Sequence, residues 1–139
     1  DLSHNPKEIP KILEQLKNYK FVIGSRYIKG GRCQMSGYRL WLSVYGNKLI
    51  KNLLNINCNE FTTSYRGFNL KKLKNFNLNS VSSKGYSFFM ETIYQIHKKK
   101  NLIKEIPITF IDRKKGKSKI PKIEIFRTFV NLFKIKLFE

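Results

Sequence analysis

Four stretches of the sequence place basic side chains where they could bind an anion. Arg26 follows an apolar run in "FVIGSRY", and Arg39 stands in "GYRLWLS" with Ser43 one helical turn later. Arg66 stands in "TTSYRGF", and "DRKKGKSK" gathers basic residues around a glycine. An arginine guanidinium offers a planar fork of N–H donors that fits phosphate oxygens. Arginines that converge at strand ends would therefore form a phosphate site, the alternatives being surface ion-pair partners and a flexible basic loop.

The spacing of apolar residues predicts the elements that must position these side chains. Asn5 is expected to cap a helix that runs to about residue 17, with Pro10 kinking or restarting it. Further helices are expected over residues 40–54 and 86–100, and buried strands over 20–24 and 102–111. In the helix over 40–54, apolar side chains recur at three- and four-residue spacing: Leu42, Tyr45, Leu49 and Leu53. Strands that alternate with helices predict an α/β domain with some parallel sheet, and residues 59–70 are expected to be irregular.

Composition and charge narrow the class of protein. The 139 residues are 41% apolar, which suits one globular domain, and no run approaches the roughly 20 apolar residues of a membrane-spanning helix. The formal net charge of +19 favours an anionic partner such as a phosphorylated ligand, a nucleic acid or a membrane surface, unless it only keeps the surface soluble. Helix-turn-helix, zinc-finger and RNP-like signatures are absent, which disfavours nucleic-acid binding. Cys33 and Cys58 are too few for a disulfide scaffold or a zinc site.

Five motifs resemble a known enzyme family in their order and spacing. They read "DLSHNP", "GSRYIKGG", "TTSYRGF", "SKGYSFFMETIY" and "EIPITFIDRKKGKSK". The ordered set resembles the dolichol-phosphate mannose synthases, the polyprenyl-phosphate mannosyltransferases among family 2 glycosyltransferases. The resemblance runs over essentially the whole chain, and "GYSFFME" and "IPITFIDRKKGKSK" are its most specific parts.

The resemblance implies a nucleotide-sugar fold of the GT-A type and an inverting transfer of mannose from GDP-mannose to a polyprenyl (dolichyl-type) phosphate. In the family the opening reads Asp-Ala-Asp-Leu-Ser-His, so Asp1 matches the second aspartate of a motif that binds Mg²⁺ or Mn²⁺. We therefore expect an α/β chain with a partial GT-A fold that lacks its N-terminal nucleotide-binding strands and is inactive alone.

The resemblance also assigns roles to individual residues. Arg26, Arg39 and Ser43 match positions that hold the acceptor phosphate in relatives. Arg113 matches the arginine of the mobile loop that closes over the site, and it is expected to be catalytic together with the metal-binding aspartate. Lys119, in the same basic run, is expected to help bind the acceptor phosphate.

Departures from the family pattern leave several roles open. Ser3 stands where some relatives have glutamine and would reach the metal only weakly or through water. Glu91 lies among apolar residues and is either a functional carboxylate or a structural group satisfied by a backbone or arginine partner. Glu91 and Arg66 are candidates for positioning the substrates. His4 and His97 are expected to be helix-terminal and surface residues rather than ligands.

The donor is the least determined substrate, because the family reads the donor base and sugar mostly with residues that precede this stretch. A sister polyprenyl-phosphate glycosyltransferase that uses UDP-glucose or another donor therefore stays an alternative. A basic nucleic-acid-binding module is a second and less favoured alternative.

The C-terminal stretch predicts a separate element. Residues 1–120 are expected to form the C-terminal part of the GT-A domain, and residues 121–139 a tail helix. On a helical wheel one side carries Ile123, Phe126, Phe129, Val130, Phe133 and Leu137, and the other Glu124, Arg127, Asn131 and Lys134. This pattern favours a helix lying in a membrane interface, the alternative being a terminal helix packed on the core. We expect peripheral binding at the cytoplasmic face of a membrane, directly or through a small anchoring subunit.

Overall fold

The computed structural model describes residues 4–112 and 122–138 and has a mixed α/β architecture. Its central sheet has three strands in the order β3-β1-β4. The middle strand β1 (Phe21–Ser25) runs parallel to β4 (Ile103–Pro107) and antiparallel to β3 (Arg66–Phe68). A second, two-stranded sheet pairs β2 (Arg32–Cys33) with β5 (Thr109–Phe110) in parallel. The expected α/β class with some parallel sheet is thus confirmed among the described residues.

The helices follow the predicted spacing closely. They are η1 (Pro6–Glu8, a 3-10 turn), α1 (Ile9–Leu16), α2 (Gly37–Leu54), η2 (Leu78–Ser80, a 3-10 turn), α3 (Tyr86–Lys98) and α4 (Lys122–Phe138). The Asn5 side chain accepts a hydrogen bond from the backbone N–H of Lys7, as expected of a cap, and α1 restarts around Pro10 after the 3-10 turn. Asn55 ends α2 in the left-handed conformation that commonly terminates helices.

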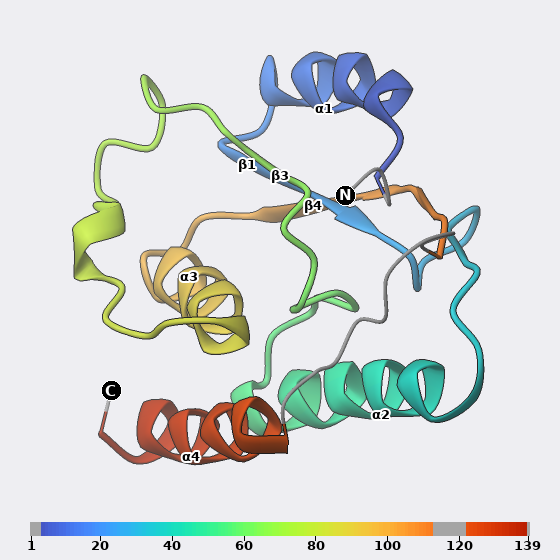
Figure 1. Ribbon diagram of the computed structural model, residues 1–139. Coiled ribbons are helices and arrows are strands. Elements are labelled where there is room, and N and C mark those ends of the chain that lie inside the picture. Colours follow the sequence, from blue (N-terminus) through green and yellow to red (C-terminus); the bar gives the residue numbers. More distant parts are fainter. Residues whose placement is uncertain (1–3, 113–121, 139) are drawn as a thin grey trace.

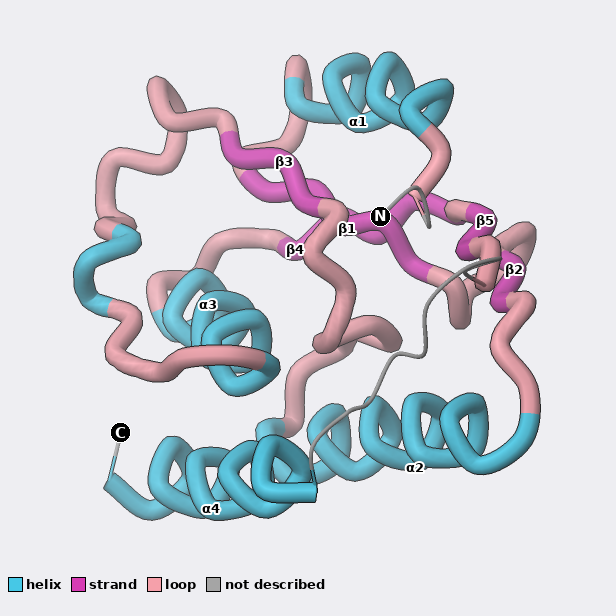
Figure 2. The backbone as a smooth tube through the Cα atoms, in the orientation of Figure 1, coloured by secondary structure: helices cyan, strands magenta, loops and turns pink. Residues whose placement is uncertain are grey.

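The helices cover the two faces of the central sheet unequally. Helix α1 lies over one face, while α3, α2 and α4 lie on the other side, with α2 and α4 along the edge of the molecule farthest from α1 (Figures 1 and 2). Helix α1 approaches β3 closely because Gly67 has no side chain: a Cβ there would lie 2.5 Å from Ile12. The small core on this side also contains Val22, Ile106 and Ile108.

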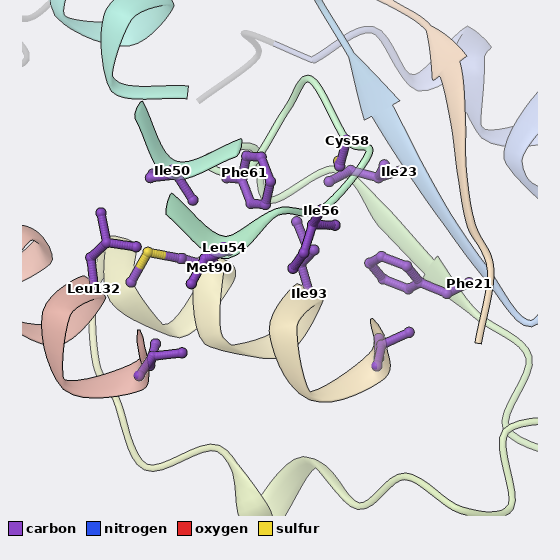
Figure 3. Close-up of a cluster of buried hydrophobic side chains, with 12 residues drawn as sticks. Phe21, Ile23, Ile50, Leu54, Ile56, Cys58, Phe61, Met90, Ile93 and Leu132 are labelled. Carbon is purple, nitrogen blue, oxygen red and sulfur yellow. The ribbon is translucent and has the colours of Figure 1, made fainter. Parts of the chain in front are cut away.

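The main core lies between β1 and the helices α2, α3 and α4. Figure 3 shows Phe21 and Ile23 from β1 facing Met90 and Ile93 of α3, with Leu132 of α4 at the far end. All five residues of β1 are buried, which explains why its apolar run predicted a strand. The strand and the three helices therefore form a rigid frame, from which the end of β1 and one side of α2 can present polar side chains.

Three expectations about secondary structure were wrong in detail. Arg66 begins strand β3 instead of lying in a loop, because the segment 66–68 pairs with β1. The stretch 102–111 is two strands, since β4 ends at Pro107 and β5 pairs with a different strand. The apolar stripe predicted for α2 is only partly buried: Tyr45 and Leu49 are exposed, whereas Asn47, Ile50 and Leu54 face the core.

Helix α4 has apolar residues on two faces. Leu132 and Ile135 are buried in the main core. The helix therefore packs on the domain, which was the alternative to the prediction of a helix in the membrane interface. The apolar stripe that suggested a membrane helix is exposed at Ile123, Phe126, Phe129, Phe133 and Leu137. One helix can have both features, because the core contact and most of the exposed stripe lie on different sides of it.

Candidate acceptor-phosphate site

A cavity of about 970 Å³ lies between the end of β1, the loop after α2, and the helices α2, α3 and α4. Its polar lining comes from His4, Arg26, Arg39, Ser43, Thr62, Thr63, Ser64, Ser83, Lys84 and Glu124. Its apolar lining comes from Met35, Leu42, Leu49, Ile50, Phe88, Phe89, Phe110, Ile125, Phe129 and Leu132, and Gly46, Gly85, Tyr86 and Thr128 complete the wall. The structure thus brings three sequence-predicted site residues, Arg26, Arg39 and Ser43, to one cavity.

Arg26 is fixed at the end of β1 by a buried ion pair. Its Nε donates to Glu60 Oε2 at 2.7 Å and its Nη2 donates to Glu60 Oε1 at 2.8 Å, which makes a two-point contact. Nη2 also lies 3.0 Å from Thr62 Oγ1. Burial alone would lower the pKa of Arg26, but the hydrogen bonds and charge of Glu60 outweigh burial and raise it. The hydrogen bonds of Arg26 within the described part of the chain use Nε and Nη2, and none uses Nη1.

Ser43 is oriented by two donors from the segment after β1. The Tyr27 hydroxyl donates to Ser43 Oγ at 2.7 Å, and Arg26 Nη2 approaches the same oxygen at 3.4 Å. Burial raises the pKa of Tyr27 to about 12, although the charge of Arg26 and the contact with Ser43 act in the opposite direction. Because Ser43 Oγ accepts hydrogen bonds on this side, its own proton is available for an acceptor in the cavity.

Arg39 lies in the first turns of α2 and reaches across to the end of the β5 segment. Its Nη1 donates to both carboxylate oxygens of Asp112, at 3.1 and 3.2 Å, and its Nη2 lies 3.7 Å from Met35 Sδ. The Nε of Arg39 is buried and has no hydrogen-bond partner in the described part of the chain. A buried N–H is costly to leave without an acceptor, so a partner for this atom is expected to stabilise the site.

His4 directly precedes the helix cap Asn5, as the helix-terminal expectation required, and it also lines the cavity. Its Nε2 lies 3.2 Å from Thr63 Oγ1, and its ring packs against Tyr65 and Phe110 with centroids 5.0 and 5.5 Å apart. Burial, followed by the charge of Arg26, lowers the pKa of His4 below 6.5. His4 is therefore neutral at pH 7 and adds no charge to the cavity.

Arg66 is placed away from the cavity and organises the loop that follows α2. Its Nε and Nη2 donate to the carbonyl oxygens of Thr63 and Phe61, and its Nη1 donates to that of Phe89 at 2.7 Å. Its guanidinium also stacks over the Phe89 ring, 4.9 Å from the centroid. Burial lowers the pKa of Arg66, since the described residues give it carbonyl partners rather than a carboxylate. Arg66 thus joins the loop to α3.

Glu91 holds the loop before α3. Its side chain is buried, and its two carboxylate oxygens accept hydrogen bonds from the backbone N–H groups of Ser82 and Ser83, each at 2.9 Å. Of the two roles left open by the sequence, this geometry matches the structural group with backbone partners. Because Ser83 and Lys84 line the cavity, Glu91 also fixes one of its walls.

The remaining predicted site residues cannot be placed. Asp1, Ser3, Arg113 and Lys119 lie outside the described residues. Within residues 4–112 and 122–138, no group of three or more His, Cys, Asp or Glu side chains could hold a metal ion. A carboxylate such as that of Asp1 is the type of ligand that Mg²⁺ and Mn²⁺ prefer. No helix in the described part of the chain is long and apolar enough to cross a membrane.

Sequence reasoning missed the residues that orient the predicted ones. Glu60, Thr62 and Tyr27 contact Arg26 or Ser43, yet nothing in their spacing indicated a shared site. The one available signal was the position of the acidic Glu60 at the start of "EFTTSYR", the motif that contains Arg66. A buried acid in a strongly basic chain is expected to pair with a buried arginine.

Comparison with known proteins supports the family resemblance that the motifs indicated. No protein-family model matches the chain. The undecaprenyl-phosphate mannosyltransferase of Micrococcus luteus is 32% identical over 121 residues, which are 86% of this chain and 50% of that enzyme. The polyprenol monophosphomannose synthase of Mycolicibacterium smegmatis is 33% identical over 122 residues, which are 86% of this chain and 46% of that enzyme. The chain spans about half the length of each, and over that half it is a homologue of polyprenyl-phosphate mannosyltransferases, as its motifs predicted.

Proposed function

We propose that this chain forms the acceptor-binding part of a glycosyltransferase that moves mannose from GDP-mannose to a polyprenyl phosphate, with inversion at the sugar carbon. The names of the two homologues support mannosyl transfer to a polyprenyl phosphate. GDP-mannose as donor, inversion and metal dependence rest on the family resemblance. The full-length gene product, meaning this chain with whatever residues precede and follow it, is the form to assay.

The observation that carries this proposal is the change in polarity along the cavity. Near the start of α2, Arg39 and Ser43, with the adjacent Arg26, present N–H and O–H donors to the cavity. Farther along α2 the lining residues are the apolar Leu49 and Ile50, and α4 contributes Phe129 and Leu132 beside the polar Glu124 and Thr128. A phosphate joined to an isoprenoid chain has the same two halves, because its dianion needs donors and its hydrocarbon needs an apolar wall.

A phosphate acceptor needs hydrogen-bond donors to hold it, but it needs no strong base to activate it. A phosphate monoester has a second pKa of about 6, so its oxygen is already an anionic nucleophile at neutral pH. In the proposed step a phosphate oxygen bonds to the sugar carbon while the bond from that carbon to the GDP oxygen breaks. Arg26, Arg39 and Ser43 would hold the phosphate, and Arg113 and Lys119 would add positive charge from the basic loop. A divalent metal on Asp1, with Ser3 as a weak neighbour, would act as a Lewis acid that stabilises the departing diphosphate.

Exposed aromatic residues on α2 and α4 support binding at a membrane surface. On α2, Tyr38, Trp41 and Tyr45 form a ladder, with ring centroids 6.3 and 4.8 Å apart. On α4, Phe126 and Phe133 are exposed. Aromatic side chains flanked by lysines and arginines are typical of surfaces that lie at the lipid headgroups. We propose that the enzyme binds peripherally at the cytoplasmic face of a membrane, alone or with a small anchoring subunit.

The test is a transfer assay with the full-length gene product. GDP-mannose, UDP-glucose and other nucleotide sugars are supplied with a long-chain polyprenyl phosphate, with and without Mg²⁺ or Mn²⁺, and the lipid product is quantified. The proposal expects metal-dependent transfer of mannose from GDP-mannose. Preferential transfer of glucose from UDP-glucose would show that the donor is UDP-glucose rather than GDP-mannose. Absence of transfer combined with salt-sensitive RNA binding would refute the proposed enzymatic function.

A further inference from the structure

We propose that Gly46, in the middle of α2, sets the width of the passage between the polar and apolar ends of the cavity, and so selects for an isoprenoid chain. This inference rests on the proposed function, because it names the residue that admits the acceptor's hydrocarbon. It adds a specificity-determining position that neither the motifs nor the homologues' names assign.

The position of Gly46 on its helix places it between two chemically different groups. Arg39 and Ser43 line the cavity from the first turns of α2, and Leu49 and Ile50 line it from later turns of the same helix. At a rise of about 1.5 Å per residue, Arg39 and Ile50 are about 16 Å apart along the axis, and Gly46 lies between them. A lipid phosphate bound along this helix would pass Gly46 directly after its head group.

The space beside Gly46 is open. A Cβ placed at this position would meet no atom within 4 Å, whereas a Cβ at Gly67 or Gly24 would lie within 3 Å of a neighbouring side chain. Glycine in a helix interior is also unfavourable relative to alanine. Packing therefore does not require glycine at position 46, where the absent side chain leaves open space in the cavity lining.

The apolar end of the cavity reaches the surface of the molecule. Leu49 of α2 is 37% exposed and Phe129 of α4 is 38% exposed, and both also line the cavity. These two side chains come from neighbouring helices that both carry exposed aromatic residues. A hydrocarbon chain that passes Gly46 could therefore leave between α2 and α4 at the surface proposed to face the membrane.

The experiment compares binding of two probes to the full-length gene product and its variants. The probes are inorganic phosphate and citronellyl phosphate, and binding is measured by calorimetry in the absence of membranes. Gly46→Ala, Gly46→Val and Gly46→Leu add side chains of increasing size. Asn52→Leu is the matched control, because it adds the same side chain to an exposed position of α2 outside the cavity lining.

Gly46→Leu is expected to weaken the binding of citronellyl phosphate about tenfold or more, because the leucine side chain would occupy the volume of the first isoprene unit. Inorganic phosphate should bind equally well to all variants, Ala and Val should have intermediate effects, and the unfolding temperature should not fall. Unchanged citronellyl phosphate binding in Gly46→Leu would overturn the inference, and so would a lower unfolding temperature, which would show that the space is not open. Failure of the wild type to bind either probe would instead refute the proposed acceptor site.

Discussion

The ion pair between Arg26 and Glu60 should be one of the most sensitive contacts in this protein. Replacing Glu60 with alanine removes two charge-assisted hydrogen bonds of 2.7 and 2.8 Å and leaves the guanidinium of Arg26, only 8% exposed as a residue, without its carboxylate. Breaking a buried pair by removing one partner costs about 3–5 kcal/mol. The same change also removes the acceptor of the Thr62 hydroxyl, which lies 2.9 Å from Glu60 Oε1. We therefore expect the free energy of unfolding to fall by about 3–5 kcal/mol.

An exposed ion pair provides a matched control. Lys17 and Glu14 are also 2.7 Å apart, but their side chains are 70% and 64% exposed. Solvent screens such a pair, so Glu14→Ala should change the free energy of unfolding by less than about 0.5 kcal/mol. Both variants are measured by urea unfolding of the full-length gene product, followed by circular dichroism. The double variant Arg26→Met with Glu60→Leu should be more stable than Glu60→Leu alone, because it buries no unpaired charge. Equal costs for the buried and exposed pairs, or no recovery in the double variant, would refute this reasoning.

Further predictions concern the core, the loop before α3 and the outer face of α4. Burial, followed by the nearby charge of Glu105, raises the pKa of Cys58 from 9.0 to about 12, so the stability linked to its neutral thiol is complete below pH 9 and is lost as pH rises towards 12. The wild type should thus lose stability over this range more steeply than Cys58→Ala, and parallel curves would contradict the buried neutral thiol. Glu91→Ala should lower the free energy of unfolding by about 1–3 kcal/mol, because it removes two part-buried hydrogen bonds to a charged group, whereas lost turnover at unchanged stability would indicate a role in the chemistry. Phe126→Ser combined with Phe133→Ser should release the enzyme from anionic liposomes in a flotation assay without loss of stability, and retained binding would place the membrane contact elsewhere.

The sequence predicted the elements with a strong apolar period and missed those defined by pairing. Helix α3 and strand β1 have long or fully buried apolar runs, and their bounds agree with the prediction to within about two residues. Strands β2 and β5 have two residues each and exist only because they pair with each other. A pairing between segments more than seventy positions apart has no local signal, so short strands of this kind cannot be read from spacing.

The candidate site was predicted in its parts but not in its connections. Motif resemblance identified Arg26 and Ser43, which line one cavity as expected. Their orientation depends on Glu60 and Tyr27, whose contribution is a matter of hydrogen-bond geometry across the fold rather than of residue type. The open space beside Gly46 could not be predicted either, since a helix pattern says where a side chain would point but not what fills the volume opposite.

The acceptor-phosphate assignment is the central claim, and steady-state kinetics of Arg39→Ala test it most directly. Arg39 lies in the cavity without being part of the buried pair, so its removal should leave the fold intact. In the full-length gene product, with GDP-mannose and citronellyl phosphate as substrates, loss of charge-assisted contacts worth about 1.5–3 kcal/mol should raise the KM for citronellyl phosphate about ten- to a hundredfold. The KM for GDP-mannose should stay within about twofold of the wild-type value. An unchanged KM for citronellyl phosphate, or an equal rise in the KM for GDP-mannose, would contradict the assignment of this cavity to the acceptor.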